Sequence, residues 1–206
     1  MSEAHTNDSI ILRNVRLAFC NNLYTPGSND EGKPRWTSCF ILTPDHPQLA
    51  EVKALLIAVA KKKWPTTYQT IIKTMKAKDM LCLHDGDLKT DKKGEIYDGF
   101  AGNMFISGAR SLKQGRPLVI NRNKQPITEE DGVTYPGCFV NAKLEFWAMD
   151  DPSFGRRINS KIITVQFARD GDAFSGGGAP DADGFDELDA SDMDDEFEGA
   201  EADALL

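Results

Sequence analysis

The feature that most limits how this chain can fold is the distribution of its charges. All 24 Lys and Arg residues lie within residues 1–170, where only 19 acidic residues oppose them, for a net charge of +5. Residues 171–206 contain the other 13 acidic residues and no basic residue. Because these acids repel one another and few apolar groups accompany them, we expect residues 175–206 to be disordered. The fold must therefore come from the residues before them.

A Gly-rich stretch, GDAFSGGGAPDADG, separates the two regions at residues 171–184. This composition is typical of a flexible linker. We therefore predict a folded domain over residues 1–174, followed by a linker and acidic tail over residues 175–206. A body of this length can bury a stable core without disulfides or metals.

Segments rich in β-branched and aromatic residues alternate with turn signals and predict five or six strands. Their ranges are 9–20, 35–43, 102–111, 117–121, 135–149 and 156–169. The first two should form a hairpin around a long loop. Between the second and third, apolar residues at helical spacing predict a helix within residues 45–64 and a second within 66–78.

The connections between the predicted strands decide the fold class. Most of them are short turn sequences such as TDKKGE and NRNKQP, not helices alternating with strands. This arrangement favours a small barrel over a parallel sheet. We predict a mostly β protein: a five-stranded oligonucleotide-binding (OB) barrel with one or two helices inserted between strands.

The cysteines and the apolar segments indicate the setting of the protein. Cys20, Cys39, Cys82 and Cys138 form no CxxC pair, and we expect them to be reduced and mostly buried. No apolar run approaches the roughly 18 residues that a membrane span needs, so we expect no membrane partner. The first ten residues do not have the pattern of a secretory signal, which predicts a cytoplasmic protein.

Catalytic motifs are scarce in this chain. The sequence contains no GxxxxGK[ST] phosphate loop, no HExxH and no GxSxG. His84, Asp85 and Asp87 could hold a divalent cation, although DGD before a Lys-rich stretch is also typical of an exposed turn. We predict that the protein is not an enzyme and has no cofactor or metal site. A metal-dependent nuclease or phosphoesterase is one alternative.

Cations and aromatic rings are interleaved along much of the body, as nonspecific binding of nucleic acid requires. The candidates for contacts to the DNA backbone are Lys89, Lys92, Lys93, Arg110, Lys113, Arg116, Arg122 and Lys143. The candidates for base stacking are Trp36, Tyr97, Phe105 and Trp147. Arg110, near the end of a predicted strand, is the leading candidate for a phosphate contact.

Strand alternation separates some of these residues into faces. Trp147 shares the polar face of its strand with Lys143, where it can stack on a base or cover an interface. Trp36 aligns with the apolar positions of its strand, which favours the core. The position of Phe105 stays ambiguous.

An ordered set of segments, DGDLK, YDGF, SGARS, RPLVI and YPGCFVNAKLEFWAMD, precedes FARDG, the Gly-rich linker and the acidic end. This set resembles the phage single-stranded-DNA-binding proteins of the DUF2815 family, which are distantly similar to the replication protein of short-tailed coliphages. The resemblance covers about residues 8–175. It implies an OB-fold that binds single-stranded DNA without strong sequence preference. It also implies a role in phage DNA replication, recombination or repair inside the infected bacterial host.

The resemblance further implies that the acidic tail competes with DNA for the basic groove and recruits replication proteins. A tethered segment of charge −13 has a high effective concentration near a body of charge +5. The partner-binding candidates are Phe197, Leu205 and Leu206. Such tails often end on an aromatic residue, whereas the last aromatic residue here is Phe197. A tail that only maintains solubility is the alternative.

Several questions stay open from the sequence. The chain could act as a monomer or a homodimer, and it could bind duplex DNA as well as single strands. A second alternative function is a protein-interaction module whose acidic tail mimics DNA. A gel-shift assay with single- and double-stranded oligonucleotides separates these functions.

Overall fold

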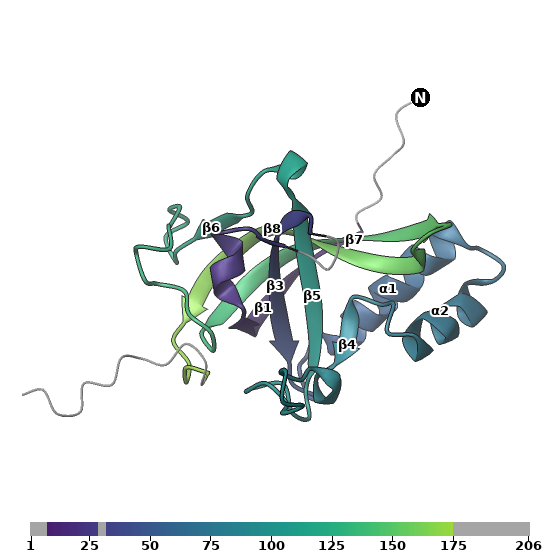
Figure 1. Cartoon of the computed structure of the whole chain (residues 1–206), viewed down its shortest axis with the longest axis horizontal. Coiled ribbons are helices and arrows are strands. Elements are labelled where there is room, and N and C mark those ends of the chain that lie inside the picture. Colours follow the sequence, from purple (N-terminus) through teal and green to yellow (C-terminus); the bar gives the residue numbers. More distant parts are fainter. Residues whose placement is uncertain (1–7, 29–31, 175–206) are drawn as a thin grey trace, which may run out of the picture.

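The computed structural model describes residues 8–28 and 32–174 of the chain (Figure 1). The strands are β1 (Ser9–Ala18), β2 (Gly27–Ser28), β3 (Pro34–Leu42), β4 (Leu83–Asp85), β5 (Met104–Ser111), β6 (Leu118–Ile120), β7 (Phe139–Asp151) and β8 (Gly155–Arg169). The helices are α1 (Leu49–Lys63) and α2 (Tyr68–Ala77), and the short 3-10 helices are η1 (Cys20–Leu23), η2 (Gly86–Leu88) and η3 (Leu112–Gln114). The predicted tail lies outside the described residues.

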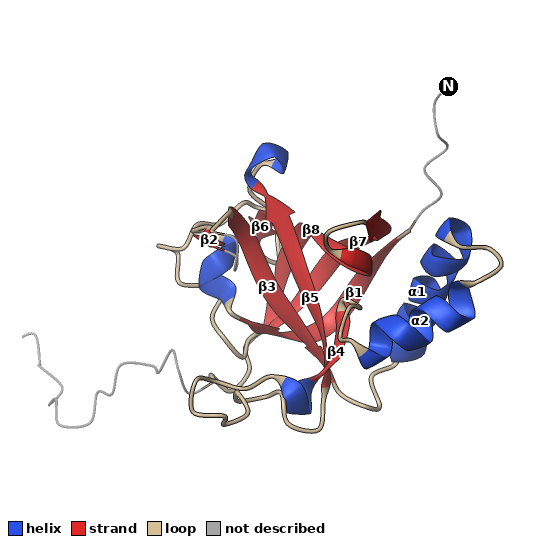
Figure 2. Cartoon of the chain, turned by 45° about the vertical axis from the view of Figure 1, so that its right-hand side comes forward, coloured by secondary structure: helices blue, strands red, loops and turns tan. Residues whose placement is uncertain are grey.

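Five of these strands close into a barrel (Figure 2). Antiparallel pairing joins β3 to β1, β1 to β7, and β7 to β8. Strand β5 pairs with β3 on one side and meets β8 in parallel on the other, through Ala109 and Lys161. The predicted mostly β fold, a five-stranded barrel with helices inserted between strands, is confirmed.

Strand β1 shows how the sequence pattern produces the inner face of the barrel. Its buried positions, Ile10 and Leu12, lie on either side of the exposed Ile11, and the register of pairing with β7 then shifts before Val15. Asn14 lies within this bulge with φ +55°. The extra residue turns Val15 inward, so Leu12 and Val15 are both buried although an odd number of positions separates them.

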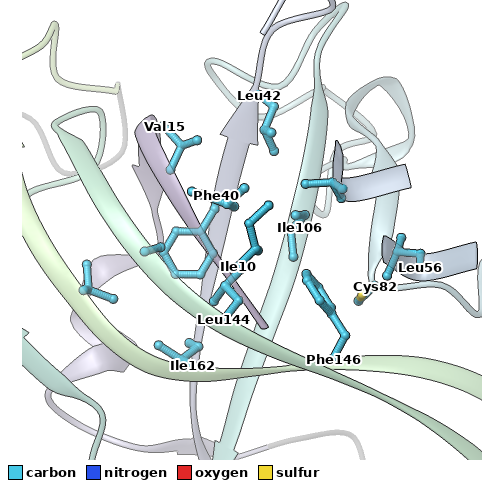
Figure 3. Packing of buried hydrophobic residues seen from close by; sticks show 14 of the residues in the cluster. Ile10, Val15, Phe40, Leu42, Leu56, Cys82, Ile106, Leu144, Phe146 and Ile162 are labelled. Atoms are coloured by element: carbon cyan, nitrogen blue, oxygen red, sulfur yellow. The ribbon is translucent and has the colours of Figure 1, made fainter. Parts of the chain in front are cut away.

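The core lies inside the barrel and continues under the helices (Figure 3). Phe40, Ile106, Leu144, Phe146 and Ile162 are each almost completely buried and come from β3, β5, β7 and β8. Burying side chains of this size contributes about 1.5–3 kcal/mol each, relative to leaving them exposed. These contacts fix which face of each strand points outward.

The two predicted helices are confirmed, and they connect β3 to β4. Helix α1 packs on β7, with Val52 and Leu56 buried. Trp64, just after α1, donates a hydrogen bond from Nε1 to Asp150 Oδ2 at 3.1 Å. This contact holds the outer part of the β7–β8 hairpin against the helices, where Figure 1 shows it extending beyond the barrel.

Other parts of the structure refine the sequence predictions. The hairpin of β1 and β3 is confirmed. The strand predicted over residues 135–149 begins only at Phe139, because Gly137 forms a turn with φ +103°. The four cysteines are buried, free thiols, as expected. Within the described ranges, none of the helices has the length and apolar character needed to cross a membrane.

Candidate nucleic-acid interface

A groove of about 520 Å³ crosses the outside of the barrel over β3, β5 and β8. Its floor comes from the outward positions of two paired strands, where Thr37 lies opposite Ala109 and Cys39 lies opposite Ser107. These four side chains are small, whereas Phe40 and Ile106 of the same strands point into the core. The sheet surface is therefore open to a flat or extended ligand.

Two aromatic rings and a lysine form one end of the groove. The rings of Phe19 and Tyr97 meet edge to face, with centroids 5.2 Å apart and an interplanar angle of 86°. Lys89 Nζ lies 5.4 Å from the centre of the Phe19 ring. The Tyr97 backbone N–H donates to the Lys89 carbonyl at 3.1 Å, so this turn holds the lysine beside the tyrosine.

A third ring lines the groove from the β7–β8 hairpin. Trp147 on β7 lies opposite Asn159 on β8, and 40% of the tryptophan surface is exposed. Arg157 also lines the groove, and its Nε donates to the Phe154 carbonyl at 2.9 Å. The groove thus combines exposed rings from two separate parts of the chain.

The charges along the groove are mainly positive. Arg35, Lys89 and Arg157 line it, against the single carboxylate of Asp79. With His84 neutral, the lining therefore carries a net charge of +2. A concave surface with this sign of charge attracts anions and raises their local concentration.

A hydrogen-bonded chain of three side chains lies along the floor of the groove. His84 Nδ1 is 2.6 Å from Asp79 Oδ1, and His84 Nε2 is 2.8 Å from Ser107 Oγ. The imidazole stacks on the ring of Phe105, with centroids 4.9 Å apart. Asp79, Ser107 and the Phe105 ring thus fix the orientation of the histidine.

The structure brings three of the predicted site residues into this groove: Lys89, Tyr97 and Trp147. The other candidates do not line it. Lys92 and Lys93 are exposed in the turn before β5, and Lys113 is exposed in η3, so all three lie outside the groove lining. The interleaved cations and rings that the sequence shows are therefore only partly neighbours in space.

Arg110, the leading candidate for a phosphate contact, has its guanidinium bound to the fold. Its Nε and Nη2 both donate to the Gln114 carbonyl, at 3.1 and 2.7 Å. Its Nη1 donates to the Ile162 carbonyl at 3.1 Å. Three of its N–H groups thus bind backbone carbonyls, and the phosphate contact of Arg110 stays a prediction.

Two of the four stacking candidates are also displaced from the groove surface. Phe105 is 5% exposed, and its ring lies between His84 and Phe100, whose centroid is 5.0 Å away. Trp36 pairs with Arg110 across β3 and β5, on the inward side of the strand. Alternation favoured a core position for Trp36, but the residue is partly exposed and belongs to neither hydrophobic cluster of the described residues. Neither residue lines the groove.

Three further cations lie on other surfaces of the barrel. The Arg116 guanidinium lies 5.8 Å from the centre of the Tyr24 ring. Arg122 donates from Nε to the Ala168 carbonyl at 2.6 Å. Lys143 is exposed on β7, which pairs with β1 and β8 and not with the strands of the groove floor.

The residues of the alternative metal site serve the local backbone. Asp85 accepts a hydrogen bond from the Asp87 N–H at 3.0 Å, and Asp87 accepts one from the Gly102 N–H at 2.7 Å. His84 is paired with Asp79. In residues 8–28 and 32–174, no cluster of three His, Cys, Asp or Glu side chains could hold a metal ion. The partner-binding candidates Phe197, Leu205 and Leu206 lie outside the described residues.

Sequence reasoning missed several residues of the groove. Arg35, Arg157 and His84 line it, together with Phe19 at the end of β1. Arg35 could have been found, because it is separated from the buried Phe40 by an odd number of positions and so faces outward. Phe19 could not, because it adopts a left-handed conformation with φ +57° immediately after the strand.

Comparisons with known proteins agree with this architecture. The chain matches the family described as the ssDNA-binding protein of Enterobacter phage Enc34 over residues 8–198. Protein p50 of Acyrthosiphon pisum secondary endosymbiont phage 1 is 37% identical over 185 residues, which cover 87% of this chain and 93% of p50.

Two solved structures share the fold. The single-stranded DNA-binding protein of bacteriophage Enc34 in complex with ssDNA has a TM-score of 0.62 and 19% identity, covering 84% of this chain and 96% of that chain. The T7 single-stranded DNA binding protein gp2.5 has a TM-score of 0.50 and 10% identity, covering 94% and 98% respectively. Since the family match spans most of the sequence, this chain belongs to the phage single-stranded-DNA-binding protein family of Enc34.

Proposed function

We propose that this protein binds single-stranded DNA in the groove across β3, β5 and β8, without strong sequence preference. The observation that carries the proposal is the convergence of exposed rings and a net positive charge on one open surface. In chain order, β3 and β5 are the second and third strands of the barrel, the face that OB-folds use for oligonucleotides. The family supports a role in phage DNA replication, recombination or repair.

The chemistry of the groove suits a single strand. Lys89, Arg35 and Arg157 can neutralise phosphates, while Tyr97 and Trp147 can stack on unpaired bases. Stacking is worth about 1–3 kcal/mol per base and tolerates any sequence, since every base has a π-face. The small floor side chains leave room for the strand and present few groups that could read base edges.

The acidic tail is the proposed competitor of DNA. Phe174, the last described residue, is 9% exposed and belongs to the same apolar cluster as Phe19 and Phe100. Its N–H donates to the Pro136 carbonyl at 3.0 Å, so the tail starts near the Phe19 end of the groove. The 32 residues beyond it would span about 31 Å as a flexible coil, enough to reach the groove.

Displacement of the tail by DNA would connect binding to recruitment of partners. DNA carries a denser charge and bases that can stack, so it should replace the tail in the groove. The freed tail would then offer Phe197, Leu205 and Leu206 to replication proteins. Removing residues 176–206 should tighten binding to oligo-dT at low salt. If the truncated protein bound no better at low salt, the proposed competition between tail and DNA would be refuted.

The groove itself is tested with single ring substitutions. Binding of fluorescently labelled oligo-dT to the full chain is measured by anisotropy for Tyr97→Ala and Trp147→Ala. Each should weaken binding by about fivefold to 150-fold, the equivalent of 1–3 kcal/mol. Phe154→Ala is the matched control, because its ring is 43% exposed but outside the groove lining.

The proposal fails if the control weakens binding as much as the groove variants, or if the wild-type protein does not bind oligo-dT. The same titration with duplex DNA determines the preference for single strands. Incubating the DNA with Mg²⁺ or Mn²⁺ tests for cleavage, which the nuclease alternative requires.

A further inference from the structure

The chain of Asp79, His84 and Ser107 has no assigned role in the binding described above. The three residues come from the connection after α2, from β4 and from β5. Antiparallel pairing of β4 with β5 places His84 opposite Phe105, within reach of Ser107 two residues further along. The imidazole is 16% exposed and Asp79 is 62% exposed, so the chain runs from solvent to the groove floor.

The same order of groups activates the nucleophile of serine hydrolases, but this site differs in one respect. In the serine proteases, the N–H of the nucleophilic serine helps to stabilise the oxyanion. Here the Ser107 N–H donates to the Cys82 carbonyl at 2.9 Å, within the sheet. The Ser107 hydroxyl is therefore better suited to bind a ligand than to attack one.

The carboxylate determines how the protons are arranged. Asp79 can only accept, so the neutral imidazole carries its proton on Nδ1 and donates it to Oδ1. Nε2 then accepts from the Ser107 hydroxyl, whose single proton is thereby engaged by the imidazole. In this state the hydroxyl offers a phosphate only lone pairs, which repel it.

Protonation of His84 reverses this hydrogen bond. The imidazolium donates from Nε2 to Ser107 Oγ, and the hydroxyl proton becomes free to donate to an oxygen in the groove. We propose that Ser107 is a backbone-phosphate contact for single-stranded DNA and that His84 takes up a proton when the phosphate binds. The inference rests on the proposed function and names a further DNA contact in the same groove.

The charges around His84 support this coupling. Asp79 stabilises the imidazolium from the α2–β4 connection, whereas Arg35, Lys89 and Arg157 line the groove from β3, the segment before β5, and β8. These three cations attract a phosphate into the groove. A bound phosphate compensates for them and favours the protonated imidazole, so binding and protonation strengthen each other.

The coupling predicts that affinity for oligo-dT rises as the pH falls from 8 to 6. One coupled proton allows at most about a tenfold change per pH unit. We expect the affinity of the full chain to be about threefold to tenfold higher at pH 6 than at pH 8, at constant ionic strength.

The experiment measures oligo-dT binding by anisotropy at pH 6, 7 and 8. Calorimetry in buffers of different ionisation enthalpy counts the protons taken up. His84→Gln should lose the pH response and the proton uptake, whatever its affinity at pH 8. Ser107→Ala removes only the hydroxyl group. This variant should lose most of the affinity that the wild-type protein gains at pH 6. His46→Gln is the matched control, because His46 Nε2 contacts the Arg13 carbonyl and lies outside the groove lining.

The outcomes separate the two proposals. If the wild-type protein binds oligo-dT but takes up no proton, or if Ser107→Ala and His84→Gln keep the full pH response, the inference is overturned and the proposed function stands. If His46→Gln removes the response, the proton belongs to another site and the inference is also overturned. If the wild-type protein fails to bind at every pH, both proposals fall. Thermal unfolding of each variant confirms that it folds.

Discussion

Replacing Lys89 with Gln should reduce the salt dependence of single-stranded DNA binding by a predictable amount. Each cation that neutralises a phosphate of a single strand contributes about −0.7 to the slope of log K against log salt concentration. The three cations that line the groove give a slope of about −2.1, an affinity loss of about 18-fold between 50 and 200 mM salt. With Lys89 removed, the slope becomes about −1.4 and the loss about sevenfold.

The assay is anisotropy with labelled oligo-dT over this range of NaCl. Lys143→Gln is the matched control, since it removes the same charge from an exposed position on β7, away from the groove floor. Both variants keep the acidic tail, so its contribution cancels in the comparison. The control should keep the wild-type slope. Equal reductions in the two variants would refute the reasoning, because they would mean that net charge and not contact in the groove determines the slope.

Two further predictions concern stability. Burial raises the pKa of the Cys39 and Cys82 thiols to about 12, whereas an unfolded thiol ionises near 9.0. Only the unfolded chain releases these protons above pH 9. The free energy of unfolding, measured in urea, should therefore fall by about 1.4 kcal/mol per thiol between neutral pH and pH 10. In Cys82→Ala this fall should be smaller by the contribution of one thiol. An equal loss in Cys82→Ala and wild type would contradict this. Gly99→Ala should destabilise by about 1–3 kcal/mol more than Gly94→Ala in urea denaturation. Both glycines have positive φ, but only at Gly99 would a Cβ lie 2.3 Å from the Phe174 ring, and equal losses would exclude that contact.

Much of the fold could be predicted from the sequence because its signals are local. Alternating apolar residues and turn sequences indicated β1, β3, β7 and β8, and helical spacing indicated α1 and α2. Strand β4 was missed, since three residues are too few to show a period. The closure of the barrel was inferred from fold class alone, because the parallel contact of Ala109 with Lys161 leaves no local signal.

The site was harder to predict because its residues depend on the pairing of strands. Arg110 lies four positions after the buried Ile106 on β5, so alternation alone could have shown that its side chain leaves the strand on the inward side. Phe105 is adjacent to Ile106 and therefore points to the outer face of the sheet. Its ring is nevertheless buried, because Phe100 from the preceding loop covers it. That burial is a tertiary effect, which period-two reasoning cannot show.

The strongest sequence signal for the groove is the small size of its floor, and this signal becomes visible only in pairs of strands. In the sequence of β3 alone, Thr37 and Cys39 do not stand out, and in β5 alone Ser107 and Ala109 indicate only a low strand propensity. Register places each of them opposite another small residue, so the two strands together expose an open strip of sheet. The cations then reach this strip from Arg35, Lys89 and Arg157, which are far apart in the sequence. A search that pairs strands first and asks where both outward faces are small would find such a surface, whereas a search for clustered lysines led to residues on other sides of the barrel.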